Sequence, residues 1–144
     1  VGITPFLAAM ERMHPDENAA VNLIYCIRSR SSAGGLDDVE EHARRLPQLN
    51  LFVMGDEGKN RLNESSLTAI VQDMPANAAA YVCGPEGVKT LVTNVWQAQG
   101  MNGRVHEERF DFRGAYGLTE LIYIGKPVLD AAKGILRATD NVAN

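Results

Sequence analysis

Short apolar runs alternate along the chain with segments in which apolar residues recur every three or four positions. The run Val21–Ile27 is almost continuously apolar, which is typical of a strand that is covered on both faces of a sheet. Strands are also predicted over Leu49–Met54 and over Ala79–Cys83, and the second of these is expected to be buried. A fourth strand is predicted over Arg104–Phe112.

Helical periodicity marks residues 6–13, 36–46, 67–74 and 88–96. Thr4 is expected to cap the first helix, with Pro5 at the first helical position. Strands that alternate with helices of roughly 10–15 residues favour right-handed crossovers and a parallel sheet. The pattern therefore predicts an α/β fold, a three-layer sandwich with a mostly parallel, Rossmann-like sheet. Ligands on such sheets bind at the carboxyl ends of the strands.

Composition narrows the class of protein. The chain has 144 residues, which fits one domain, and its net charge of −4 argues against a protein that coats nucleic acid or anionic membrane. Neither Cys26 and Cys83 nor the three histidines show the spacing of a metal site, so no metal is expected. No apolar run approaches the roughly 20 residues of a membrane span, and we expect a cytoplasmic segment without membrane contact.

Two turns carry candidate chemistry, because a helix N-terminus offers N–H groups to an anion. Gly2-Ile3-Thr4-Pro5 allows close backbone approach and adds a hydroxyl, and Cys83-Gly84-Pro85-Glu86 places a sulfur at the end of a strand. Taken alone, each turn is also compatible with an ordinary helix start.

Together, and in this order along the alternating strands and helices, the motifs resemble the NAD(P)H-binding domain of the ferredoxin–NADP reductase family, in particular its ferric-reductase-like flavin oxidoreductases. The matching residues are Gly-x-Thr-Pro at 2–5, Arg28, Arg61-Leu62, Cys83-Gly84-Pro85 and Glu108-Arg109-Phe110. The resemblance covers about residues 1–112.

The resemblance implies hydride transfer from a nicotinamide to FAD or FMN, and then electron transfer to an iron, haem or iron–sulfur acceptor. It assigns cofactor binding to Gly2, Thr4, Pro5, Arg28, Ser29, Arg30, Arg61, Cys83, Gly84, Pro85 and Phe110, and catalytic roles to Cys83 and Glu108. Two simpler interpretations stay open. Cys83 also fits a buried apolar position, and residues 106–112 also fit an ordinary strand.

The Arg28-Ser29-Arg30 segment and Arg61 favour NADPH over NADH. Guanidinium groups form charge-assisted bonds to a 2′-phosphate, whereas sites for NAD often hold an acidic residue. Loop arginines are commonly just solvated, however, and family members that use NADH also carry an arginine here. Both NADPH and NADH therefore remain compatible with the sequence.

The resemblance also implies further segments and partner domains around the matching region. Family members place an apolar strand, and before it a flavin-binding barrel, ahead of the position of Val1. We therefore expect a truncated NAD(P)H-binding domain over residues 1–113, whose sheet lacks its first strand and which does not bind flavin alone. The expected partners are a flavin-binding domain, in some cases within a membrane-bound reductase, and an electron acceptor. The alternative is a nucleotide-sensing or interaction module without catalysis.

Residues 114–144 form a C-terminal extension, with a predicted strand over Leu121–Ile124 and a predicted helix over Val128–Ala138. The strand is apolar enough to fill the vacant place in the sheet, in its own chain or in the partner of a swapped homodimer. Packing outside the sheet is the other alternative.

Overall fold

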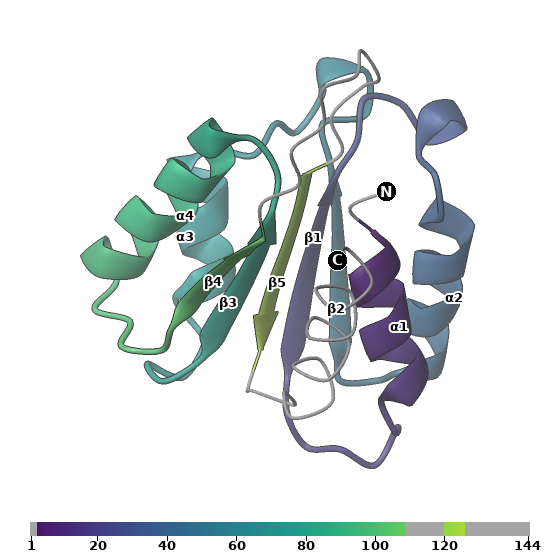
Figure 1. Cartoon of the computed structure of the whole chain (residues 1–144), viewed down its shortest axis with the longest axis horizontal. Helices are drawn as coiled ribbons and strands as arrows, with labels where there is room; N and C mark the ends of the chain where they lie inside the picture. The colour runs from purple at the N-terminus through teal and green to yellow at the C-terminus, as the bar shows by residue number, and fades with distance from the viewer. Residues whose placement is uncertain (1–2, 109–119, 126–144) are drawn as a thin grey trace, which may run out of the picture.

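A five-stranded sheet lies between two layers of helices in the computed structural model, which describes residues 3–108 and 120–125 (Figure 1). The elements are α1 (Thr4–Arg12), β1 (Val21–Cys26), α2 (Leu36–Arg45), β2 (Leu49–Met54), α3 (Glu64–Val71), β3 (Ala79–Cys83), α4 (Glu86–Ala98), β4 (Val105–Glu108) and β5 (Glu120–Gly125), with 3-10 turns η1 (Arg30–Ser32) and η2 (Asp56–Gly58). The prediction of an α/β, Rossmann-like fold is confirmed.

The strand order is β2-β1-β5-β3-β4. β1 and β2 are parallel, as are β3 and β4, whereas β5 runs antiparallel to both of its neighbours. Ile122 of β5 lies opposite Ile24 on one side and Val82 on the other. The prediction that the extension supplies a strand to the sheet is therefore confirmed within one chain, and packing of this strand outside the sheet is wrong. The predicted helix over residues 128–138 lies outside the described residues.

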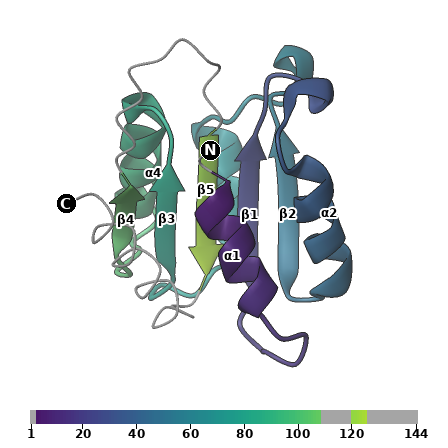
Figure 2. The ribbon, with the colours of Figure 1, turned by 45° about the vertical axis from the view of Figure 1, so that its right-hand side comes forward.

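Each face of the sheet has its own apolar core. Helices α1 and α2 cover one face, and α3 and α4 cover the other (Figure 2). All six residues of β1 are buried between these layers, which agrees with its continuous apolar run. Tyr25, which is fully buried, donates its hydroxyl hydrogen bond to the Gly34 carbonyl at 2.6 Å and so ties β1 to the loop that precedes α2.

Helix α1 begins differently from the prediction. Its N-cap is Ile3, and the carbonyl of Ile3 accepts hydrogen bonds from the N–H groups of Phe6 and Leu7. Ile3 itself has helical dihedral angles, so the prediction that Thr4 caps the helix is wrong. Thr4 is instead the first helical residue, with its side chain exposed and without a capping bond.

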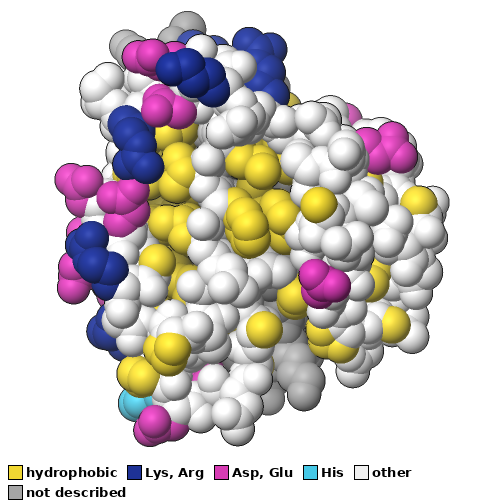
Figure 3. Space-filling view, turned by 180° about the vertical axis from the view of Figure 1, so that it is seen from behind, with side chains coloured by type: hydrophobic (Ala, Val, Ile, Leu, Met, Phe, Trp, Pro, Cys, Tyr) yellow, Lys and Arg dark blue, Asp and Glu magenta, His cyan; other side chains and the backbone are white. Residues whose placement is uncertain are grey.

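Strand β2 is one of the two outer strands of the described sheet and is less covered than β1. Leu51, Phe52, Val53 and Met54 are only half-buried, because no further strand lies beside them in the described part of the chain. Figure 3 shows hydrophobic side chains gathered on the rear face of the molecule, next to a border of acidic and basic side chains.

Candidate functional site

The four parallel strands end at one edge of the sheet, and α1 begins there (Figure 2). Because β5 runs in the opposite direction, its first residue, Glu120, lies at this edge opposite Cys26. The helix that follows β1 (α2) and the helix that follows β3 (α4) pack on opposite faces of the sheet. The order in which the strands are added to the sheet therefore reverses between β1 and β3. In open α/β sheets such a switch point is where ligands bind. Strand β5 occupies the place between β1 and β3 at this point.

The loops that follow β1 and β2 are locked together. The Ile27 N–H donates to the Met54 carbonyl at 2.8 Å, and the Glu57 N–H donates to the Arg28 carbonyl at 2.7 Å. Gly55 has a φ of 86°, and a Cβ added there would lie 2.6 Å from the Ile27 carbonyl oxygen. Only glycine fits this approach, which fixes the Arg28 loop against the Arg61 loop.

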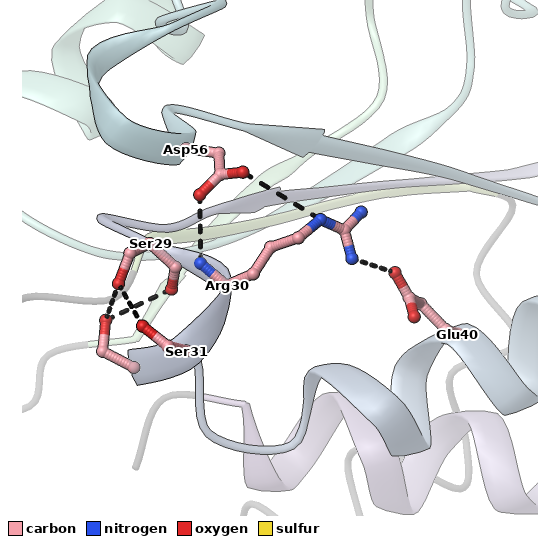
Figure 4. Close-up of polar contacts among 6 residues, drawn as sticks. Ser29, Arg30, Ser31, Glu40 and Asp56 are labelled. Atoms are coloured by element: carbon pink, nitrogen blue, oxygen red, sulfur yellow. Dashed lines mark hydrogen bonds and ion pairs between the residues drawn. The ribbon is translucent and has the colours of Figure 1, made fainter.

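Arg30 is already engaged by carboxylates (Figure 4). Its Nη1 donates to Glu40 Oε1 at 2.7 Å, and its Nε lies 4.0 Å from Asp56 Oδ2. Its backbone N–H also donates to Asp56 Oδ1 at 3.0 Å. The hydrogen bond to Glu40 raises the pKa of Arg30 above its usual value. The charge of Arg30 is therefore balanced within the protein, and its clearest contribution is to hold the loop between β1 and α2.

Arg28 and Arg61 differ from Arg30, because both are exposed and neither forms an ion pair with a described residue. The Arg61 guanidinium lies over η2, where a Cβ added to Gly58 would be 3.7 Å from Arg61 Nη2. The Ser29 hydroxyl oxygen lies 3.2 Å from that of Ser31 and 2.8 Å from that of Ser32 (Figure 4). Two arginines and three hydroxyl groups thus stand on two adjoining loops, a donor set suited to a phosphate.

The Cys83 motif lies on the other side of β5. Cys83 ends β3 with 5% of its surface exposed and is opposite Glu108 of β4 and Leu121 of β5 in the strand register. The backbone therefore brings the two predicted catalytic positions side by side. Gly84 is half-buried, and Pro85 is the N-cap of α4. Gly2 and Phe110 lie outside the described residues.

A shallow hollow that the sequence did not indicate lies beside β2. It measures about 660 Å³ and is lined by Leu51, Phe52, Val53, Met54, Gly58, Asn60, Arg61, Asn63 and Ser66. Asn63 and Ser66 are held there by a reciprocal cap of α3, in which each side chain bonds the backbone of the other. The sequence signal for such a hollow is the run of mostly polar residues at 58–66, which follows β2 and the turn at Gly55.

One curated protein is similar to most of this chain. The NADPH oxidoreductase of Mycobacterium tuberculosis (strain ATCC 25618 / H37Rv) is 30% identical to it over 147 aligned positions. The match covers 95% of this chain. The chain spans 38% of the length of that protein. No family model matches the sequence, and no solved structure matches it.

Residues 3–108 and 120–125 contain no group of three or more His, Cys, Asp or Glu side chains that could hold a metal ion. No helix in these ranges has the length and apolar character that crossing a membrane requires.

Proposed function

We propose that the chain binds NADP(H) at the carboxyl edge of its sheet and is the nicotinamide-dinucleotide module of a flavin-dependent oxidoreductase. The observation that carries the proposal is the pair of adjoining loops that present Arg28 and Arg61 without carboxylate partners among the described residues. The similarity to a protein named NADPH oxidoreductase supports the same cofactor.

The two sides of the site take different parts of the dinucleotide in this proposal. Arg28 and Arg61, with the Ser29 hydroxyl, bind the 2′-phosphate, because charge-assisted bonds to phosphate are the strong polar contacts of such sites. Thr4, Pro5, Gly84 and Pro85 lie at the starts of α1 and α4 and contact the rest of the cofactor.

The nicotinamide supplies the hydride when the dinucleotide is bound. Cys83 and Glu108 act by positioning in this proposal, since hydride transfer depends on alignment and on exclusion of water. The buried Cys83 gives a compact apolar wall at the end of β3. A flavin on a separate domain takes the hydride and passes single electrons to an iron, haem or iron–sulfur acceptor.

Titration calorimetry of the 144-residue chain with NADP⁺ and NAD⁺ tests the cofactor. A charge-assisted bond contributes about 1.5–3 kcal/mol, so NADP⁺ should bind about 10- to 150-fold more tightly than NAD⁺. Arg28→Ala and Arg61→Ala should each weaken NADP⁺ binding and leave NAD⁺ binding unchanged. Equal affinities for the two nucleotides in all three proteins would refute the cofactor assignment.

Arg104→Ala is the matched control, because Arg104 is exposed directly before β4, at the opposite edge of the sheet. This substitution removes the same charge and should change neither affinity. A loss of NADP⁺ affinity in Arg104→Ala equal to that in Arg28→Ala would show that net charge, rather than the two loops, attracts the nucleotide.

The flavin part of the proposal has its own test. The chain alone should purify colourless and should not reduce ferricyanide with NADPH. A flavin absorbance spectrum that persists through purification, or reductase activity without added flavin, would contradict the assignment of the flavin to another domain. Failure to bind either nucleotide, with the fold intact, would instead favour an interaction module.

A further inference from the structure

Arg30 is withheld from the candidate phosphate site by one side chain rather than by distance. It follows Ser29 directly in the chain and stands two positions after Arg28, and the proposed function assigns both of these residues to the 2′-phosphate. The side chain of Arg30 is 57% exposed, so little packing holds it in one place. The guanidinium turns instead toward α2, where its Nη1 donates to Glu40 Oε1 at 2.7 Å (Figure 4).

The backbone and the side chain of Arg30 are held by different carboxylates. Asp56 Oδ1 accepts a hydrogen bond from the Arg30 backbone N–H at 3.0 Å, which fixes the start of η1. The distance from Arg30 Nε to Asp56 Oδ2 is 4.0 Å, which is beyond hydrogen-bond reach. Among the described residues, Glu40 alone therefore accepts a hydrogen bond from the guanidinium. Removal of the Glu40 charge should release this side chain and leave the loop in place.

The pair of Arg30 with Glu40 is weak enough for a phosphate to replace the carboxylate. The two side chains are 57% and 30% exposed, and ion pairs of this kind contribute little in water. A guanidinium can also form two parallel bonds to a phosphate, whereas it makes a single bond to Glu40 here. Because the pair is weak but present, Glu40 should lower the affinity of the site for a phosphate without abolishing it.

We propose that Glu40 is a specificity-determining residue, which competes with the 2′-phosphate for Arg30 and so limits the preference of the site for NADP⁺ over NAD⁺. The inference rests on the proposed function, because that function places the 2′-phosphate at these loops. NAD⁺ carries no phosphate at this position and gains nothing from a released Arg30. The charge of Glu40 therefore changes the affinity for NADP⁺ alone.

Titration calorimetry of the 144-residue chain and its Glu40→Gln variant with both nucleotides tests this role. Glu40→Gln keeps the size of the side chain and removes its charge. It should tighten NADP⁺ binding about fivefold, near the upper end for an exposed ion pair, and leave NAD⁺ binding unchanged. Glu40→Ala removes the acceptor as well and should give at least the same gain.

Arg30→Ala shows whether the gain acts through the guanidinium. In the natural chain, where Glu40 engages Arg30, this substitution should change the NADP⁺ affinity by less than about twofold. In the double variant Glu40→Gln/Arg30→Ala, the gain produced by Glu40→Gln should be lost. A gain that survives in the double variant would overturn the proposal, as would NADP⁺ binding that Glu40→Gln leaves unchanged or weakens.

Glu41→Gln is the matched control, because Glu41 is the next residue on α2 and forms a comparably short pair with Arg44 at 2.6 Å. Arg44 stands near the end of α2, whereas the candidate phosphate loops adjoin its start. This substitution removes the same charge and should change neither affinity. An equal gain in NADP⁺ affinity from Glu41→Gln would contradict the proposal, because net charge would then explain the effect.

The same titrations distinguish the role of Glu40 from the proposed function. If NADP⁺ binding depends on Arg28 and Arg61 but does not respond to Glu40→Gln, the proposed function stands and the role of Glu40 is refuted. If the natural chain binds both nucleotides equally and Glu40→Gln prefers NADP⁺, the role of Glu40 stands and the proposed preference of the natural chain is refuted. Absence of binding of either nucleotide to every variant would refute both.

Discussion

Gly55 joins the two loops of the candidate phosphate site, and Gly55→Ala should therefore reduce stability and NADP⁺ binding together. A left-handed conformation costs an alanine about 1–2 kcal/mol relative to glycine. The new Cβ would stand 2.6 Å from the Ile27 carbonyl oxygen, whereas ordinary contact begins at 3.4 Å. The loops must therefore separate by roughly 0.8 Å (3.4 − 2.6). Such a shift strains the neighbouring Ile27–Met54 hydrogen bond, which contributes about 0.5–1.5 kcal/mol.

The sum is a loss of about 1.5–3.5 kcal/mol, a substantial part of the roughly 5–15 kcal/mol that holds a typical domain folded. Urea unfolding followed by circular dichroism measures this loss, and calorimetry on the folded protein measures the affinity for NADP⁺. Gly34→Ala is the matched control, because its Cβ would meet nothing within 4 Å and its φ is not in the left-handed region. We expect Gly34→Ala to change the free energy of unfolding by less than about 0.5 kcal/mol. If the two variants unfold at the same urea concentration, the steric argument for Gly55 is refuted.

Three further predictions concern the sheet. Burial raises the pKa of Tyr81 to about 12, so the stability gained from its neutral form is complete below pH of about 10 and is lost as the pH rises toward 12. Tyr81→Phe should flatten that part of the stability profile in urea titrations, and an unchanged slope would count against it. Tyr25→Phe leaves the Gly34 carbonyl without its donor and should lower the free energy of unfolding by about 1–3 kcal/mol in the same assay. An unchanged free energy of unfolding would show that this hydrogen bond does not stabilise the loop. Ile122→Pro removes a donor from the central strand and should lower the thermal midpoint and speed amide exchange in β1 and β3; unchanged exchange there would argue against the central place of β5.

Hydrophobic patterning was enough to locate the strands, but not to say how well each is covered. The bounds predicted for β2 and β3 agree with the structure, because these runs are short and apolar and each is followed by a glycine. Coverage depends on the order of strands in the sheet, which connects residues far apart in the chain. A run such as Leu49–Met54 therefore looks the same in the sequence whether its strand is central or at the edge.

The candidate site shows the same division between local and distant information. That Arg28 and Arg61 lie on adjoining loops follows from β1 and β2 being parallel neighbours, which the alternation of strands and helices indicated. The pairing of Arg30 with Glu40 and Asp56 could not be predicted, because it joins residues 10 and 26 positions away through the packing of α2 and η2. The prediction for Thr4 rested on a weak preference, since capping by a threonine is worth only about 1 kcal/mol. The buried Ile3, which has helical dihedral angles, takes the N-cap position instead.

The central place of β5 also has a consequence for the order of folding. Among the described strands, the pair β2-β1 and the pair β3-β4 are joined in the sheet only through β5, the last strand to be synthesised. Its pairing with β1 connects residues about 100 positions apart, and long-range pairing of this kind slows folding because a large loop must close first. Of the described strands, β5 alone pairs with the inner edges of β1 and β3, so no other described strand can close these edges before residue 125 has been synthesised. A chaperone that shields apolar strands would have its greatest effect on this protein during that interval.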